Sequence, residues 1–344
     1  MKFLSKDIGI DLGTSNVLIY QQGKGIALRE PAVVAMDRNT GRVLEVGAAA
    51  RNMLGRTPGH ITAVHPLTDG AISDYELTVQ MLSTMFKRVV KGAIVKPRVV
   101  ISIPSGVTEV EERAVIQAAM EAGARRVYLI EEVRAAALGA SVNMEDAEGH
   151  MVVDMGGGTT DIGVLTMNEV AYSTSLKVAG MTFDEAIVRY VRKNLGIAIG
   201  ESTAEEIKLT IGCVAERPGR QTMIVTGRDI RTGLAKSFEI HSDQVMEALR
   251  RPVRQILERI ADVMDQVTPE LAADVAKNGI VLTGGSGQIW GMDRLIEERM
   301  NIKCTLADDA DFCVAYGCGK SLEWMNHMIE GPINIDRHRK MRGY

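Results

Sequence analysis

Three glycine-rich turns in this chain carry the residue types that phosphate binding requires. Each turn follows an apolar run, and in two of them an aspartate comes first. Glycines leave backbone N–H groups bare for an anion, hydroxyls add donors, and a carboxylate at a strand end can bind hydrated Mg²⁺. The residues in question are Asp11 with Thr14, Ser15 and Asn16, Asp154 with Gly157, Gly158 and Thr159, and the run Gly284, Gly285, Ser286 and Gly287.

The first two turns repeat one pattern. Residues 8–20 and 151–166 both read as an apolar strand, an aspartate, a glycine-rich turn with hydroxyls, and a second apolar strand. One such stretch alone is equally compatible with an ordinary glycine-rich hairpin. Two copies, one opening each half of the chain, predict duplicated domains that face each other across a nucleotide.

Bulk properties set the class of protein. A chain of 344 residues with 46% hydrophobic residues is long enough for two domains, each with its own core. A net charge of −4 argues against a dedicated nucleic-acid binder. The N-terminus has too short an apolar run for a signal peptide, and no segment reaches the length of a spanning helix, so we expect a cytosolic protein. Its four cysteines then read as reduced thiols.

Helical spacings alternate with β-branched runs along the chain, which predicts an α/β layered fold. We place domain I at residues 1–145 and domain II at 146–313, with small inserted subdomains at about 31–74 and 181–241. Capping boxes predict helix starts at Thr108, Thr182 and Thr203, and Pro252 should kink or restart a helix over 242–267. The basic tail, 329–344, is expected to be a solvated end.

Four segments resemble the MreB and Mbl bacterial actins, within the superfamily of actin, sugar kinases and chaperone ATPases. The similarity runs from about residue 5 to 322 and leaves the paralogue open. It implies an actin-like fold of two duplicated ribonuclease-H-like domains with a nucleotide cleft between them, and a last helix, 314–328, that returns to domain I. The segments are Asp7-Ile8-Gly9-Ile10-Asp11-Leu12-Gly13-Thr14, Gly55-Arg56-Thr57-Pro58-Gly59, Val152-Val153-Asp154-Met155-Gly156-Gly157-Gly158-Thr159-Thr160 and Thr268-Pro269-Glu270-Leu271.

The resemblance also implies roles in binding and hydrolysing ATP. Glu132, at a predicted strand end, would orient the attacking water with help from Thr159, although Val133-Arg134 replace the usual Pro-Met after it. The alternative for Glu132 is a surface glutamate on a strand-to-helix turn. Mg²⁺ would be held through water by Asp11 and Asp154. Ribose and base would contact Glu205, Glu206, Ile207 and Lys208, and the third turn, Gly284 to Gly287, would pass under the adenosine. That turn usually reads three glycines and an alanine.

An apolar tip ringed by cations predicts contact with a membrane surface. Ile94 and Val95 form the tip, and the cations are Lys87, Arg88, Lys91, Lys96 and Arg98. Phe3 and Leu4 would add a second weak anchor. The alternative is a strand-entry loop in which both apolar side chains are buried.

These expectations combine into a slow ATPase coupled to polymerisation. The resemblance implies filaments and paired protofilaments, a peripheral location at the inner face of the cell membrane, and transmembrane partners of the cell-elongation machinery. It further implies a role in organising wall synthesis and rod shape, without nucleic acid. A sugar kinase of the same superfamily is the alternative function, and a chaperone-type ATPase is a weaker one.

Overall fold

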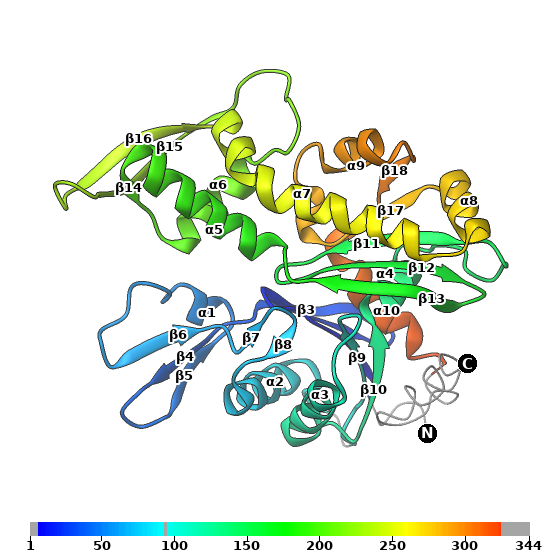
Figure 1. Cartoon of the computed structure of the whole chain (residues 1–344). Coiled ribbons are helices and arrows are strands. Elements are labelled where there is room, and N and C mark those ends of the chain that lie inside the picture. The colour runs from blue at the N-terminus through cyan, green and yellow to red at the C-terminus, as the bar shows by residue number, and fades with distance from the viewer. Residues whose placement is uncertain (1–5, 93–94, 325–344) are drawn as a thin grey trace. The chain divides into compact units, whose positions relative to one another are not determined.

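The computed structural model describes residues 6–92 and 95–324, and the chain divides into two compact units. Unit 1 comprises Met1–Asn143 with Phe312–Tyr344, and unit 2 comprises Met144–Asp311. In Figure 1, unit 1 is coloured blue to cyan-green and again red, and unit 2 runs from green to orange. The chain therefore leaves unit 1 once and returns to it with its last described helix.

Unit 1 is built on a five-stranded sheet with the order β10-β9-β1-β2-β3. The first three strands along the chain pair antiparallel, whereas β9 and β10 run parallel to β1. Alternation along β1 sends Ile8 and Ile10 into the core with α2 (Tyr75–Val89) and α3 (Glu109–Ala122), as expected for a strand buried on that face. The strands are β1 (Ile8–Leu12), β2 (Asn16–Gln21), β3 (Gly25–Pro31), β9 (Arg98–Ile103) and β10 (Arg126–Glu131).

Further elements complete unit 1. The helices α2 (Tyr75–Val89) and α3 (Glu109–Ala122) pack together, and α3 begins with the predicted Thr108–Glu111 capping box. A smaller three-stranded sheet has the order β5-β4-β6, which lies within the predicted insertion. The remaining elements of this part are β4 (Val34–Asp37), β5 (Val43–Val46), α1 (Ala48–Arg51), β6 (Ile61–Val64), β7 (Leu67–Thr68) and β8 (Ala71–Ile72).

The helix α10 (Cys313–Ser321) packs closely on α4 (Glu132–Gly139) and on β1. Glycines make this approach possible. A Cβ added at Gly317 would overlap the backbone of Ala135, and one added at Gly9 would lie 2.6 Å from the backbone carbon of Cys318. The face of β1 opposite the core therefore contacts the backbone of α10 directly.

Replacing Gly317 by Ala should destabilise unit 1 by about 3 kcal/mol, because the added methyl cannot be accommodated by rotating a side chain. In a helix with space for the methyl group, the same change would stabilise the protein by up to about 1 kcal/mol. The sign of the change in the free energy of unfolding therefore shows whether the packing is close. Chemical denaturation measures the effect. Gly59→Ala, where a Cβ meets nothing within 4 Å, is the control. Unchanged stability of the Gly317 variant would contradict the close packing.

Unit 2 repeats the sheet of unit 1. Its order is β13-β12-β11-β17-β18, with three antiparallel strands followed by two parallel ones. The strands β3, β2, β1, β9 and β10 of unit 1 therefore correspond, in spatial order and in direction, to β13, β12, β11, β17 and β18 of unit 2. The strands are β11 (His150–Met155), β12 (Thr160–Thr166), β13 (Glu169–Leu176), β17 (Ile280–Thr283) and β18 (Cys304–Leu306). The predicted α/β fold with duplicated domains is confirmed.

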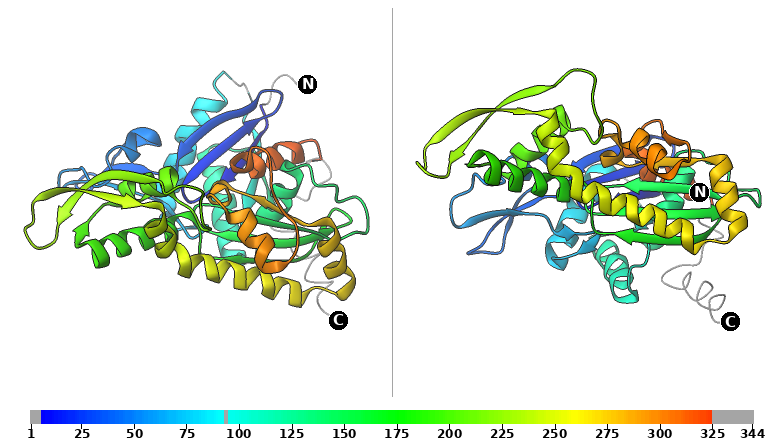
Figure 2. Two further views of the ribbon diagram at one scale, coloured as in Figure 1. Left: turned by 90° about the horizontal axis from the view of Figure 1, so that it is seen from above. Right: turned by 45° about the horizontal axis from the view of Figure 1, so that its top comes forward.

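The longest helix, α7 (Ser242–Gln266), covers the sheet of unit 2 along β12 and β13, and the two views of Figure 2 show it beside these strands. Of the kink or restart predicted at Pro252, the restart is wrong, because α7 runs through Pro252 as a single helix. One face of α7, from Val245 to Val263, is buried in the core. Burial along that whole face stabilises the helix enough to offset the hydrogen bond that proline removes.

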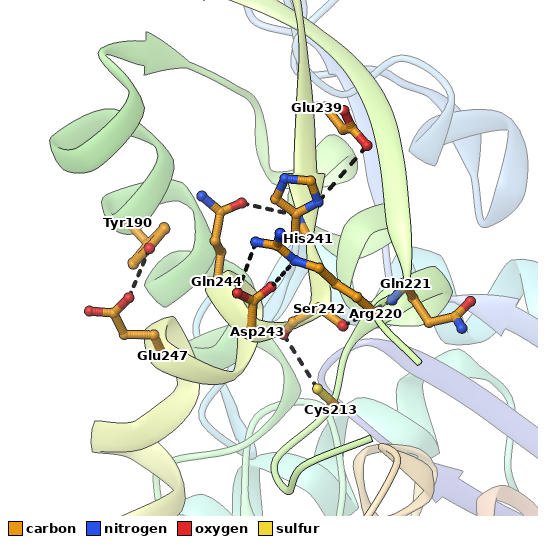
Figure 3. A network of polar contacts seen from close by, with 10 residues as sticks. All are labelled: Tyr190, Cys213, Arg220, Gln221, Glu239, His241, Ser242, Asp243, Gln244 and Glu247. Atoms are coloured by element: carbon orange, nitrogen blue, oxygen red, sulfur yellow. Dashed lines mark hydrogen bonds and ion pairs between the residues drawn. The ribbon is translucent and has the colours of Figure 1, made fainter. Parts of the chain in front are cut away.

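A polar network fixes the first turn of α7 to the small sheet β14-β15-β16 (Figure 3). Arg220 donates two hydrogen bonds of 3.0 Å to Asp243, and the backbone N–H of His241 donates to Gln244. Tyr190, the last residue of α5 (Gly180–Tyr190), donates a hydrogen bond of 2.9 Å to Glu247. These bonds attach α5 and the small sheet to one end of α7. The strands are β14 (Ile197–Ala198), β15 (Thr222–Asp229) and β16 (Ala235–His241).

Two helices of unit 2 begin earlier than the capping boxes predicted. The first starts at Gly180, and Thr182 lies in its first turn, where its hydroxyl accepts from the N–H of Ala179. The second starts at Glu201 with Gly200 as its cap. The same sequence signature thus marks the third helical residue instead of the cap. The elements are α5 (Gly180–Tyr190), η1 (Val191–Leu195), α6 (Glu201–Ile211), α8 (Pro269–Asn278), η2 (Gly285–Gln288), α9 (Met292–Met300) and η3 (Ala310–Phe312).

Candidate functional site

The first glycine turn connects β1 to β2 at the carboxyl end of β1. Asp11 is half-buried on β1, where it pairs with Leu18. Thr14 is buried, and its hydroxyl oxygen accepts a hydrogen bond of 3.0 Å from the N–H of Gly70. The carbonyl of Ser15 accepts from the N–H of Ala32. The turn is therefore held by neighbouring segments of unit 1, and the Thr14 hydroxyl keeps its own proton for donation. Asn16, also predicted to bind, is the first residue of β2.

Glu132 and Asp11 lie at the same edge of the sheet in unit 1. Strands β1, β9 and β10 are parallel neighbours, and Glu132 is the first residue of α4, directly after β10. Burial raises the pKa of the Cys318 thiol well above its usual value, and the charges of Asp11 and Glu132 raise it further. Both carboxylates thus act on one buried thiol. Glu132 itself is buried, which contradicts the alternative of a surface glutamate.

The second glycine turn connects β11 to β12 in unit 2. The N–H of Gly156 donates to the carbonyl of Thr159 at 2.9 Å and closes the turn. Asp154 is buried on β11, and the Thr283 hydroxyl donates to its Oδ1 at 2.6 Å. Desolvation raises the pKa of Asp154 to about 7; the Thr283 hydrogen bond lowers it, and the charge of Asp161 raises it. A bound cation would reverse this balance by stabilising the carboxylate.

The third glycine turn is hydrogen-bonded to the second within unit 2. The N–H of Gly284 donates to the carbonyl of Ala310, and the Ser286 hydroxyl donates to the carbonyl of Gly156 at 2.6 Å. The N–H groups of Gly180 and Met181, at the start of α5, donate to the carbonyls of Gly156 and Gly157. The structure therefore brings together two of the three predicted turns within unit 2, and it adds the first turn of α5, which sequence reasoning missed.

Helix α6 places its four predicted residues differently. Lys208 Nζ donates to the carbonyl of Gly180 at 3.0 Å and to Asp184 Oδ2 at 2.8 Å. Ile207 is fully buried in the core, so its side chain is used for packing. Glu205 is half-buried and Glu206 is exposed. Lys208 therefore contacts the start of α5, the segment beside the glycine turns.

Three functional candidates were missed from the sequence. Gly180 and Asp184 lie in the first two turns of α5, and Thr283 ends β17. Thr283 could have been found, because it immediately precedes the third glycine turn at the end of a strand parallel to β11. Gly180 and Asp184 could not, because the capping box put the helix start after Gly180.

The predicted membrane tip is only partly within the described residues. Ile94, Phe3 and Leu4 lie outside them, and Val95 is half-buried. Lys6 Nζ donates to the carbonyl of Lys91 at 2.8 Å, so the start of the described chain lies beside the base of this tip. Arg88, another cation of the ring, pairs with Glu30 at 2.9 Å. Within residues 6–92 and 95–324, no helix has the length and apolar character needed to cross a membrane.

Replacing Asp154 by Asn should stabilise the nucleotide-free protein at pH 8. The folded-state pKa of Asp154 is raised to about 7, above the ordinary aspartate value, so the folded chain binds an extra proton between about pH 4 and 7. Wild-type stability therefore falls as the pH rises through that window, by at most about 4 kcal/mol. Melting curves at pH 5 and pH 8 should differ more for wild type than for the variant. Parallel pH dependence of the two would contradict the assignment.

Two units with one strand order, each with an aspartate before a glycine turn, define an actin-like fold. MreB5 of Spiroplasma citri bound to ADP matches with a TM-score of 0.89 and 36% identity, over 93% of this chain and 97% of that one. The same protein bound to AMPPNP matches with a TM-score of 0.90 and 35% identity, over 97% and 99%. A MamK double helical filament, at 21% identity and a TM-score of 0.78, shows the fold alone.

The chain belongs to the MreB/Mbl protein family, which it matches over residues 5–330. It is 43% identical over 331 residues to the cell shape-determining protein Mbl of Bacillus subtilis, covering 96% of this chain and 99% of the relative. It is 44% identical over 328 residues to the cell shape-determining protein MreB of Escherichia coli, covering 94% of each. The resemblance drawn from the sequence is confirmed.

Proposed function

We propose that this chain is an ATP-dependent, actin-like protein that polymerises on the inner face of the cell membrane and organises wall synthesis and rod shape. The observation that carries the proposal is the aspartate and glycine turn repeated at the same place in two sheets of the same strand order. The relatives named as cell shape-determining proteins support the role, and the solved relatives bound to ADP and AMPPNP support nucleotide as the ligand.

Each unit would supply its own phosphate donors from its glycine turns. Thr14, Ser15 and Asn16 would supply donors from unit 1, and Gly157, Gly158 and Thr159 from unit 2. Lys208, Glu205 and the third turn would contact ribose and base. The second turn supports the proposal, because protein donors already bind the carbonyls of Gly156, Gly157 and Thr159. Bare N–H groups of such a turn are then available for an anion.

Asp11 and Asp154 would hold Mg²⁺ through water, and the metal would neutralise phosphate charge. The donor set fits: Asp154 is a buried carboxylate with a raised pKa, which a nearby divalent cation would return to its charged form. Glu132 would orient the attacking water, and the Thr159 hydroxyl would assist. Burial at the start of α4 restricts Glu132 to few orientations, which suits a group that must position a water molecule.

Sedimentation tests the assembly. With ATP and Mg²⁺ the full chain should pellet as filaments, and without nucleotide it should stay in the supernatant. A coupled assay for sugar phosphorylation runs in parallel, because a sugar kinase was the alternative from the sequence. A protein that stays monomeric at all concentrations and phosphorylates a sugar would overturn the proposal.

Liposome co-sedimentation tests the membrane part separately. Replacing Ile94 and Val95 by Ser should weaken binding to anionic liposomes while pelleting with ATP alone continues. The reason is that the apolar tip would supply burial in the lipid while the surrounding cations attract the surface. Val110→Ser, an exposed apolar residue on α3, is a matched control. Equal liposome binding by wild type and the tip variant would remove the membrane assignment.

A further inference from the structure

Four polar groups of unit 2 meet around Gly180, and we call this set the Gly180 junction. It consists of the Gly156 carbonyl, the backbone of Gly180, the Lys208 ammonium and the Ser286 hydroxyl. Gly156 O accepts from the N–H of Gly180 at 3.3 Å and from Ser286 Oγ at 2.6 Å, and Gly180 O accepts from Lys208 at 3.0 Å. The junction thus connects the second glycine turn, the third glycine turn, α5 and α6.

The junction has no space for another side chain. A Cβ added at Gly180 would lie 2.6 Å from Ser286 Oγ, 3.3 Å from Lys208 Nζ and 3.4 Å from Gly156 O. These distances place the hydroxyl and the ammonium directly against the backbone of α5. Because the carbonyl of Gly156 accepts two hydrogen bonds, rotation of that peptide would break both of them.

Among the groups of the Gly180 junction, the Ser286 hydroxyl is the one that a substitution can remove while the other groups stay in place. The Gly180 N–H belongs to the backbone, and Lys208 is also paired with Asp184. A hydroxyl-to-carbonyl bond in a half-buried place restricts the turn in the free protein and lowers the ordering cost of binding an anion.

We propose that Ser286 is a positioning residue that holds the second glycine turn in its anion-binding shape and thereby slows the release of nucleotide. This inference rests on the proposed function, since it takes a nucleoside di- or triphosphate as the ligand. It is separate from hydrolysis, because Ser286 contacts the turn and not the reacting atoms. The Lys208 ammonium holds the adjoining end of α5 through Gly180, so the two residues fix the turn from α6 and from η2.

The test compares full-length wild type with Ser286→Ala and Ser286→Cys. The alanine removes the donor, and the cysteine keeps a side chain of similar size with a weak donor. Ser237→Ala on β16, whose hydroxyl pairs with Thr226 at 2.9 Å on the exposed face, is the matched control in the same unit. Two readouts are measured: the dissociation rate of a fluorescent ADP, and hydrogen exchange of the amides of residues 156–159 without nucleotide.

Loss of the hydroxyl should speed ADP release about three- to tenfold, with cysteine intermediate, and should speed exchange in the second turn in the same order. The Ser237 control should match wild type. Release and exchange unchanged in Ser286→Ala would overturn the inference. If the wild type itself does not bind ADP, the proposed function fails, and the exchange readout still decides whether Ser286 restrains the turn.

Discussion

Replacing Glu132 by Gln is expected to leave ATP affinity within about twofold and to slow phosphate release about 100-fold or more, the usual cost of losing a group that activates or positions the attacking water. The side chain is buried at the first position of α4, so glutamine fills the same volume without a charge. The affinity should hold because the donors proposed for the phosphates come from the glycine turns. Single-turnover phosphate release and equilibrium binding separate the two effects.

Glu131→Gln is the matched control for this prediction. Glu131 is the neighbouring carboxylate, it ends β10, and it accepts a hydrogen bond of 3.4 Å from the Ser105 hydroxyl. Its replacement should change hydrolysis far less, because that side chain is engaged with the loop after β9. Turnover that is unchanged in Glu132→Gln, or lost equally in both variants, would remove Glu132 from its proposed role.

Replacing Lys208 by Met is expected to destabilise unit 2 by about 3 kcal/mol, the lower range for removing one partner of a buried ion pair. Lys208 and Asp184 lie 2.8 Å apart, and each side chain is only 12% exposed. Without the ammonium, Asp184 must be buried either charged and unpaired or protonated. The melting temperature of the unit should fall by about 6–12 °C, which differential scanning calorimetry measures.

The pH dependence and a double variant make this prediction specific. Desolvation already raises the pKa of Asp184 to about 6, and Lys208 lowers it. Removing Lys208 raises the folded-state pKa further, so the variant loses more stability as the pH rises above the ordinary aspartate value. The deficit should be smaller at pH 5 than at pH 8. Lys208→Met with Asp184→Asn should recover most of the loss; a double variant as unstable as the single one would contradict the pairing.

The sheets could be predicted from the sequence because their strands are apolar runs that end at glycine turns. Strands β1 and β2 begin and end within a residue of the predicted stretch 8–20, β11 and β12 begin and end within a residue of 151–166, and the third turn follows β17 as predicted. Helix starts were harder. In α5, Thr182 is the third helical residue and not the cap. The pattern of a threonine followed three residues later by a glutamate cannot distinguish these two positions.

The candidate site could be predicted where chemistry is local to one turn and not where it depends on packing between distant segments. Asp154 and the glycines after it are contiguous in sequence, whereas the Thr283 hydroxyl reaches Asp154 across 129 positions. Likewise, Lys208 was expected to contact a ligand, but its bonds to Gly180 and Asp184 depend on how α6 packs against α5. A single sequence can point to Thr283 as a candidate, but it does not show which side chains pair with one another.

The return of α10 to unit 1 sets the order in which the chain can fold during synthesis. Unit 2 ends at Asp311, so all of its strands have been translated before α10 exists. Unit 1 is synthesised first, but its β1 and α4 cannot pack against α10 until this last described helix leaves the ribosome. We therefore expect unit 2 to complete its contacts before unit 1 does, in contrast to the usual order in which the N-terminal domain folds first. In a stalled nascent chain that has left the ribosome as far as Asp311, the amides of β11 and β12 should be protected from exchange before those of β1.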